Sequence, residues 1–112
     1  MIDPKDYLPL GSIVALKTGK GLGVIIGQGP MVKTRKNAQK ETYYDYIVGS
    51  YPKGVTSDMR VVTDHDRIKR VIFRGYEDEE SKQALVALSE KRKGIKENFF
   101  YHLLFKNWFF RI

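Results

Sequence analysis

The sequence predicts an α+β protein, with a small curved antiparallel sheet or an SH3-like barrel of about five strands followed by one or two C-terminal helices. Short apolar runs separated by glycine-containing turns fill residues 7–75, and a helical pattern follows at 77–94. Because the strands precede the helical pattern and do not alternate with it, parallel βαβ units are disfavoured. At 112 residues the chain is expected to form one domain.

A β-hairpin is the first element that the sequence predicts. The apolar runs 13–16 and 22–26 flank a glycine-containing turn. A polar, basic stretch at 33–40 has no apolar periodicity, so we expect an exposed loop or a hairpin tip there. Residues 42–48 are rich in aromatic and β-branched side chains and predict a third strand, in which alternation places Tyr44, Tyr46 and Val48 on one face.

Two shorter strands and a helix complete the expected fold. The strands are predicted at 59–62 and 68–73, joined by a polar segment in which Thr63 or Asp64 is suited to cap a single helical turn. In the helix, acidic residues gather at 77–80 and basic residues at 91–93, as the helix dipole favours. Gly94 is placed to end it. Its narrow apolar stripe (Ala84, Leu85, Leu88) predicts that the helix rests on the sheet.

The C-terminal segment, 95–112, differs in composition from the rest of the chain. Its apolar residues are spaced for a helix but cover nearly the whole helical circumference. One contact surface cannot bury all of them. The segment is therefore either sandwiched within its own fold or meant for another chain.

Composition narrows the function classes. The chain has no cysteine, which excludes disulfides, thiolate metal sites and a cysteine nucleophile. Its net charge of +7 permits attraction to phosphate or to an acidic partner without identifying either. No signal-peptide pattern opens the sequence and no apolar run reaches the ~18 residues that a membrane span needs. The expected location is the cytoplasm.

No residue pattern indicates catalysis. The glycines at 19–23 lead into a predicted strand, whereas phosphate-binding loops lead into a helix N-terminus. The segment 64–66 (Asp-His-Asp) is interpreted as a solvated loop with local hydrogen bonds, because neighbouring residues point in different directions. No serine lies in a strand–elbow–helix context. We therefore expect no enzyme activity, no cofactor and no metal site.

The motifs together resemble a small uncharacterised family of low-GC Gram-positive bacteria. The matching segments are YLPLGSIV at 7–14, YDY at 44–46, YPKG at 51–54 and GYEDEE at 75–80. Members are often encoded near type VII secretion genes and LXG-type toxins, so the resemblance implies an accessory, adaptor or chaperone-like role. It implies no activity. The segment from Ile95 onward has no counterpart in the family pattern.

Two main hypotheses of function follow, from different classes. The first is a protein-interaction module that binds an LXG-type toxin, its helical partner or a second copy, with anchors in the aromatic tail. These anchors are Phe99, Phe100, Leu103, Leu104, Trp108 and Phe109. The alternative is a nucleic-acid-binding SH3-like module in which cations attract phosphate and tyrosines stack on bases. Its residues are Lys33, Arg35, Lys36, Lys40, Tyr44 and Tyr46. A further alternative is an immunity protein for a co-encoded toxin.

Overall fold

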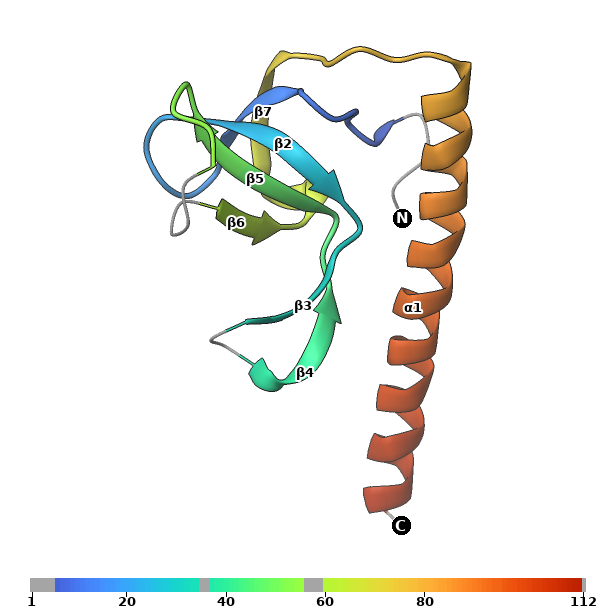
Figure 1. The fold of residues 1–112 in the computed structure, drawn as a ribbon. Helices are drawn as coiled ribbons and strands as arrows, with labels where there is room; N and C mark the ends of the chain where they lie inside the picture. Colours follow the sequence, from blue (N-terminus) through green and yellow to red (C-terminus); the bar gives the residue numbers. More distant parts are fainter. Residues whose placement is uncertain (1–5, 35–36, 56–59, 112) are drawn as a thin grey trace.

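The computed structural model describes the backbone of residues 6–34, 37–55 and 60–111, and the side chains of these residues other than 34, 37–38 and 96–111. Strands occupy the N-terminal part and one long helix follows them (Figure 1). The elements are β1 (Ile13–Leu16), β2 (Leu22–Gln28), β3 (Met31–Thr34), β4 (Asn37–Tyr43), β5 (Tyr46–Tyr51), β6 (Arg60–Thr63), η2 (His65–Arg67), β7 (Ile68–Phe73) and α1 (Glu79–Arg111).

The main sheet is antiparallel, with the strand order β6-β5-β2-β1-β7. β6 and β7 lie at opposite edges, although only residues 64–67 join them. The edges of a flat five-stranded sheet would be about 19 Å apart, and the connection includes η2, a 3₁₀ turn that advances only about 2 Å per residue. The sheet must therefore curve strongly. The predicted α+β class with a curved antiparallel sheet is confirmed.

The sheet does not close into an SH3-like barrel, so that alternative is wrong. Among the described residues, no pairing joins β6 to β7. The connection between them is held at the start of β5, because Asp64 accepts a hydrogen bond from the Asp45 N–H and the His65 N–H donates to the Asp45 carboxylate. These bonds hold the connection against β5 and leave both edges of the sheet without a strand partner.

Several strand predictions are confirmed. β1 and β2 form the expected hairpin, β7 occupies 68–73, and β6 coincides with the run predicted at 59–62 except that it extends to Thr63. Met59 lies outside the described residues. The single helical turn expected after Thr63 is η2; Asp64 occupies its N-cap position, but its side chain makes no capping hydrogen bond. The basic stretch at 33–40 belongs to a hairpin, because β3 and β4 pair with each other.

The strand predicted at 42–48 is broken in the middle. β4 ends at Tyr43 and β5 begins at Tyr46, and the facing strands β2 and β3 break at the same level. Backbone hydrogen bonds cross this level from Gly29 to Asp45 (2.9 Å) and from Tyr44 to Pro30 (3.1 Å). Pro30 has no N–H to donate and Gly29 has a φ of +64°. The long hairpin therefore bends here, and β3–β4 swings away from the main sheet (Figure 1).

The helical pattern and the aromatic segment form one continuous helix, α1. Its start is capped as a reciprocal pair: the Ser81 N–H donates to the Asp78 carboxylate and the Asp78 N–H donates to the Ser81 hydroxyl, both at 2.8 Å. The prediction that Gly94 ends the helix is wrong. A mid-helix glycine costs only about 1 kcal/mol, strong helix formers flank it, and no atom lies within 4 Å of where its Cβ would be.

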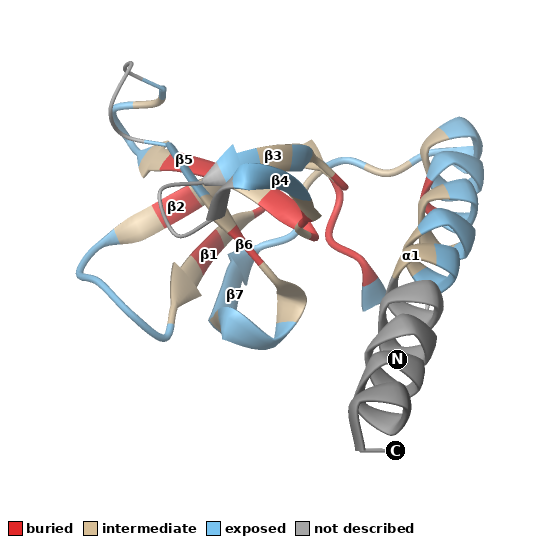
Figure 2. Ribbon diagram, turned by 90° about the horizontal axis from the view of Figure 1, so that it is seen from below, coloured by how far each residue is buried: buried red, intermediate tan, exposed pale blue. Residues whose placement is uncertain are grey.

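The core lies between the concave sheet, the N-terminal segment and the first half of α1. Its buried side chains are Tyr7, Leu8, Val14, Ile25, Tyr46, Val48 and Leu85. Residues 7–9, which precede the first predicted strand, are buried between the sheet and α1 (Figure 2). Leu85 and Leu88 come from the predicted apolar stripe, which therefore does rest on the sheet. No helix in the described part of the chain has the length and apolarity that a bilayer crossing requires.

Candidate functional site

A buried carboxylate lies at the bend between β4 and β5. Asp45 is completely buried, and its carboxylate accepts hydrogen bonds from three directions. Arg92 Nε of α1 donates at 2.7 Å, the Tyr7 hydroxyl at 3.1 Å and the His65 backbone N–H at 2.8 Å. A buried charge is tolerated only when it is paired and hydrogen-bonded. Asp45 therefore ties together the N-terminal segment, the connection before β7 and α1.

Arg92 is the helix side of this contact. Its side chain is largely buried, and desolvation acts to lower the pKa of the guanidinium. The hydrogen bond and the negative charge of Asp45 outweigh that effect, so the pKa of Arg92 is raised. Arg92 thus keeps its positive charge at all ordinary pH values. Because Asp45 precedes β5 and Arg92 lies 47 residues later in the chain, this contact closes a long loop.

A second branch of the network centres on Tyr46. The Leu8 N–H donates to its hydroxyl oxygen (3.0 Å), and the hydroxyl lies 2.8 Å from His65 Nδ1. Burial raises the pKa of Tyr46 well above its usual value, so the phenol keeps its proton. The arrangement is satisfied when Tyr46 donates to an unprotonated Nδ1. The hydrogen bonds of the 64–66 segment are therefore not local, as expected from the sequence, but reach back to residues 45 and 46.

The tyrosines around Asp45 also remain protonated. Tyr7 and Tyr43 share a hydroxyl contact of 3.1 Å, and burial is the main cause that raises the pKa of both. The polar atoms of this cluster thus bind one another. The role of the cluster is structural: its hydrogen bonds position α1 and the N-terminal segment on the sheet.

The stability of the fold is expected to decrease in mild acid because of His65. Burial, assisted by the Arg92 charge, lowers the pKa of His65 from its usual 6.5, against the opposing Asp45 carboxylate. Below about pH 6.5 the His65 side chain of the unfolded chain binds a proton, whereas that of the folded chain does not. The unfolding free energy therefore has its full value above that pH and decreases as the pH falls toward the pKa of His65 in the folded chain. The slope for one proton is at most about 1.4 kcal/mol per pH unit.

Urea unfolding of the full chain at several pH values checks this expectation. The control is His65→Asn, whose amide oxygen is able to accept the Tyr46 hydroxyl proton but does not titrate. The difference in unfolding free energy between the two proteins should fall as the pH falls below about 6.5. A pH-independent difference would show that His65 does not titrate in this window.

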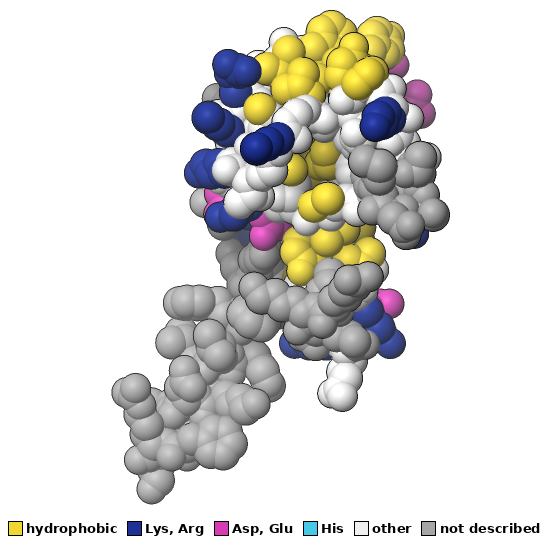
Figure 3. All heavy atoms as spheres, turned by 90° about the vertical axis from the view of Figure 1, so that its left-hand side faces the viewer, with side chains coloured by type: hydrophobic (Ala, Val, Ile, Leu, Met, Phe, Trp, Pro, Cys, Tyr) yellow, Lys and Arg dark blue, Asp and Glu magenta, His cyan; other side chains and the backbone are white. Residues whose placement is uncertain are grey.

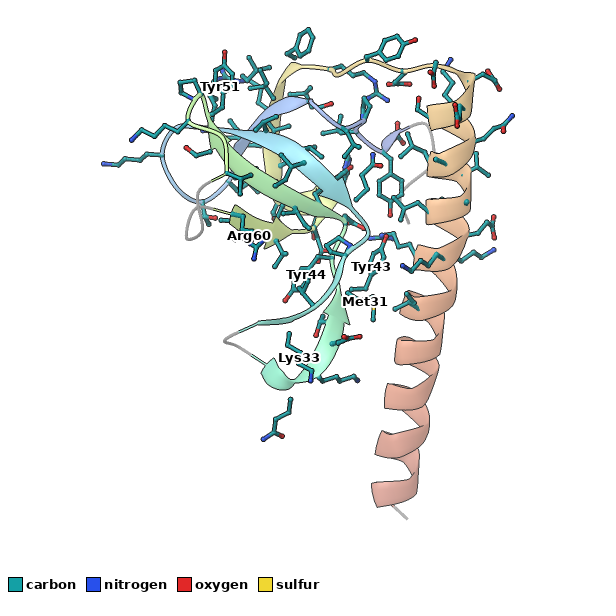
Figure 4. All side chains as sticks on the ribbon, in the orientation of Figure 1. Met31, Lys33, Tyr43, Tyr44, Tyr51 and Arg60 are labelled. Carbon is teal, nitrogen blue, oxygen red and sulfur yellow. The ribbon has the colours of Figure 1, made fainter. Side chains whose placement is uncertain are left out.

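The residues of the nucleic-acid hypothesis are not brought together as expected. Lys33 and Lys40 are exposed on the β3–β4 hairpin, and Arg35 and Lys36 lie outside the described residues. Tyr44 lies in the bend, and Figure 4 shows Tyr43 and Tyr44 pointing to opposite sides, with Tyr43 toward α1. Tyr46 is fully buried in the core, so its ring has no free face on which a base could stack. The expected stacking pair on one strand face does not form, because the strand breaks.

The anchors of the protein-interaction hypothesis lie in the second half of α1. The backbone of 96–111 is helical, but the side chains of Phe99, Phe100, Leu103, Leu104, Trp108 and Phe109 lie outside the described residues. The described contacts of α1 with the sheet are Leu85, Leu88 and Arg92, all before Gly94. The first half of α1 is thus attached to the sheet.

An exposed surface on β7, which we name the β7 surface, was not predicted as a site. Its exposed apolar members are Leu10, Val71, Ile72, Phe73 and Tyr76, and its exposed cations are Arg67, Lys69 and Arg70. Figure 3 shows exposed apolar side chains with Lys and Arg side chains beside them on one face of the molecule, without separating those of β7 from exposed apolar residues elsewhere, such as Tyr51 and Val55. The structure exposes nearly the whole of β7, which lies at the sheet edge.

Sequence reasoning also missed Tyr7, Asp45 and Arg92 as a connected set. The YDY motif placed Asp45 among aromatic residues of a strand, which is an unusual position for a carboxylate and the one local signal of a buried partner. Nothing local identifies Arg92 as that partner, since five Lys or Arg residues lie within 82–96.

The fold and its buried hydrogen-bond network around Asp45 define a class of small α+β proteins with an open, curved antiparallel sheet and a C-terminal helix. The chain belongs to the family described as a domain of unknown function, DUF4176, whose pattern matches residues 7–84. The match covers the sheet and the start of α1, and it ends just before Leu85. No curated protein and no solved structure matches the chain.

Proposed function

We propose that this chain is a non-enzymatic protein-interaction module that presents the second half of α1 to another protein. The partner that the family resemblance favours is an LXG-type toxin of type VII secretion or the helical protein that accompanies it, which makes the chain an accessory or chaperone-like protein. The single observation that carries the proposal is the position of the helix contacts: Leu85, Leu88 and Arg92 hold α1 to the sheet, and the aromatic residues follow them.

Two further features support this function. The polar groups of the buried network bind one another, so the network is explained by stability and not by chemistry on a substrate. The tail carries nine aromatic or large aliphatic residues between 99 and 110, a density typical of interface anchors. A helix that offers such residues fits a groove or another helix of a partner.

Removal of residues 95–112 is expected to abolish partner binding and leave the fold intact. The contacts of Leu85, Leu88 and Arg92 with the sheet are all retained in 1–94. On this proposal the unfolding free energy of 1–94 should fall by no more than about 1 kcal/mol, from fraying of the new helix end. The measurement is an affinity purification of the tagged chain from the native host, with and without residues 95–112, followed by reconstitution of the captured pair from purified proteins.

A second variant keeps the helix at full length. This variant replaces three tail residues spaced four apart, Phe100, Leu104 and Trp108, by serine. Its control is Val86→Ser, a substitution on the described half of α1. Capture of an LXG-type toxin or its helical partner by the full chain and by the control, but by neither tail variant, supports the proposal. An unfolded 1–94 fragment would show that the tail belongs to the core of its own domain.

A further inference from the structure

β7 is an edge strand that exposes apolar side chains on a scale unusual for a single strand. Val71 and Ile72 are each 44% exposed and Phe73 is 58% exposed. β1 is its neighbour on one side, and within the described residues no strand covers the other side. Leu10 lies against this end of the strand, because the Gly75 N–H donates to the Ser12 hydroxyl and Gly75 contacts the Leu10 backbone. Exposed apolar side chains gathered on one edge strand are a feature of interaction sites.

The strand is irregular in a way that turns its side chains outward. Its register with β1 shifts at two points, where Phe73 and Val71 pair with Ile13 and Val14, and where Arg70 and Ile68 pair with Ala15 and Leu16. Ile72 and Lys69 are therefore extra residues without a direct partner on β1. Bulges of this type bend a strand and re-aim its side chains. The exposed side chains of the β7 surface are thus apolar at 71–73, and they are basic at Arg67, Lys69 and Arg70.

The positive charge of the β7 surface is not neutralised within the described residues. Arg67, Lys69 and Arg70 are exposed, and the ion pairs found in those residues, Arg74–Glu77 and Arg92–Asp45, do not include them. A second copy docked on the same strand would bring another set of the same cations to the junction, and like charges across neighbouring strands are destabilising. The cations therefore oppose self-association through β7 and favour a ligand that carries carboxylates.

We propose that the β7 surface binds an extended segment of a partner protein in which apolar residues are followed by acidic ones. If the segment runs antiparallel to β7, as the paired strands of this sheet do, its apolar residues meet 71–73 and its carboxylates then meet Arg70 and Lys69. Nucleic acid would match the cations but not the aliphatic side chains of Leu10, Val71 and Ile72. This surface is separate from the second half of α1, and the proposal does not rest on the proposed function.

A titration with synthetic peptides tests this proposal. The probe is an acetylated and amidated peptide with the core Val-Ile-Val-Glu-Glu, and its counterpart has Lys-Lys in place of Glu-Glu. The ¹⁵N-labelled full chain should show shift changes confined to residues near 10 and 67–76, and it should bind the acidic peptide about tenfold more tightly than the basic one, as two favourable cross-strand charge pairs allow. Equal binding of the two peptides, binding elsewhere, or no binding overturns the proposal.

Charge reversal tests whether the preference for the acidic peptide comes from the β7 cations or from the net charge of the whole chain. The double variant Lys69→Glu/Arg70→Glu should reverse the preference and bind the basic peptide more tightly. The matched control Lys82→Glu/Lys91→Glu makes the same change of net charge on exposed positions of α1 and should keep the preference for the acidic peptide. An equal loss in both variants overturns the proposal.

Other occupants are distinguished in the same experiment. Sedimentation of the full chain as a dimer that the β7 variant abolishes would assign the surface to a second copy. Binding of single-stranded DNA, or of phosphatidylglycerol vesicles, that the β7 variant abolishes while the acidic peptide fails to bind would assign it to phosphate recognition. Each of these outcomes contradicts the proposed acidic segment.

Discussion

Replacement of Asp45 by alanine is expected to destabilise the fold by about 3–5 kcal/mol, the cost of leaving one partner of a buried ion pair without the other. Small domains are stable by about 5–15 kcal/mol in total, so the variant should retain little stability. Arg92 would lose its counter-charge, and the Tyr7 hydroxyl and the His65 N–H would lose their acceptor. The measurement is urea unfolding of the full chain followed by circular dichroism.

The control for this prediction is Asp66→Ala, an exposed carboxylate in the same connection, whose cost should stay within about 0.5 kcal/mol. A double-mutant cycle with Arg92→Leu adds a sharper test. Because the second substitution removes a charge that is already without a partner, it should cost less on the Asp45→Ala background than on the natural chain. Additive costs would contradict a direct ion pair between Asp45 and Arg92.

Replacement of Leu85 by alanine is the second large effect that we expect, with a loss of about 2–5 kcal/mol of unfolding free energy. Leu85 is 4% exposed and joins α1 to the core of the sheet. Its neighbour Leu88 approaches Gly29 so closely that a Cβ on Gly29 would clash with it. A cavity at Leu85 therefore cannot be filled by a small shift of the helix, because the next turn already touches the backbone of the bend.

Val86→Ala is the matched control, since Val86 is adjacent to Leu85 but 51% exposed. Its cost should stay below about 1 kcal/mol. Hydrogen exchange distinguishes the two ways in which Leu85→Ala can act. Faster exchange confined to α1 indicates that the helix detaches locally, and faster exchange in β2 and β5 as well indicates that helix and sheet unfold together. Equal stability of the two variants would show that α1 is not packed through Leu85.

The elements predicted correctly are those encoded by neighbouring residues. The β1–β2 hairpin follows from two apolar runs and the glycine turn between them, and the start of α1 follows from its acidic first turn and the Asp78–Ser81 cap. β7 was placed at its observed bounds for the same reason. In each case the interactions that stabilise the element lie within a few residues, so a short window of sequence contains the information.

The errors occur where a distant contact overrides the local pattern. Tyr44 and Asp45 have strand-like neighbours, but Asp45 turns inward to meet Arg92 and the strand breaks. Tyr7 precedes the first predicted strand, yet its ring packs edge-on against Tyr46 with centroids 5.9 Å apart. Gly94 resembles a helix end, but α1 continues through it to Arg111, at a cost of only about 1 kcal/mol for a glycine within a helix.

By itself, the sequence determined the class of fold, most of the element positions, the absence of cysteine chemistry and the apolar character of the tail, because periodicity, turn residues and composition are local properties. Only the tertiary structure decided that the sheet stays open, that Asp45 and Arg92 form a buried pair, and that β7 exposes its apolar residues beside unneutralised cations. These features depend on which of many similar side chains meet across the fold. That choice is made by the packing of the whole chain, and no single segment records it.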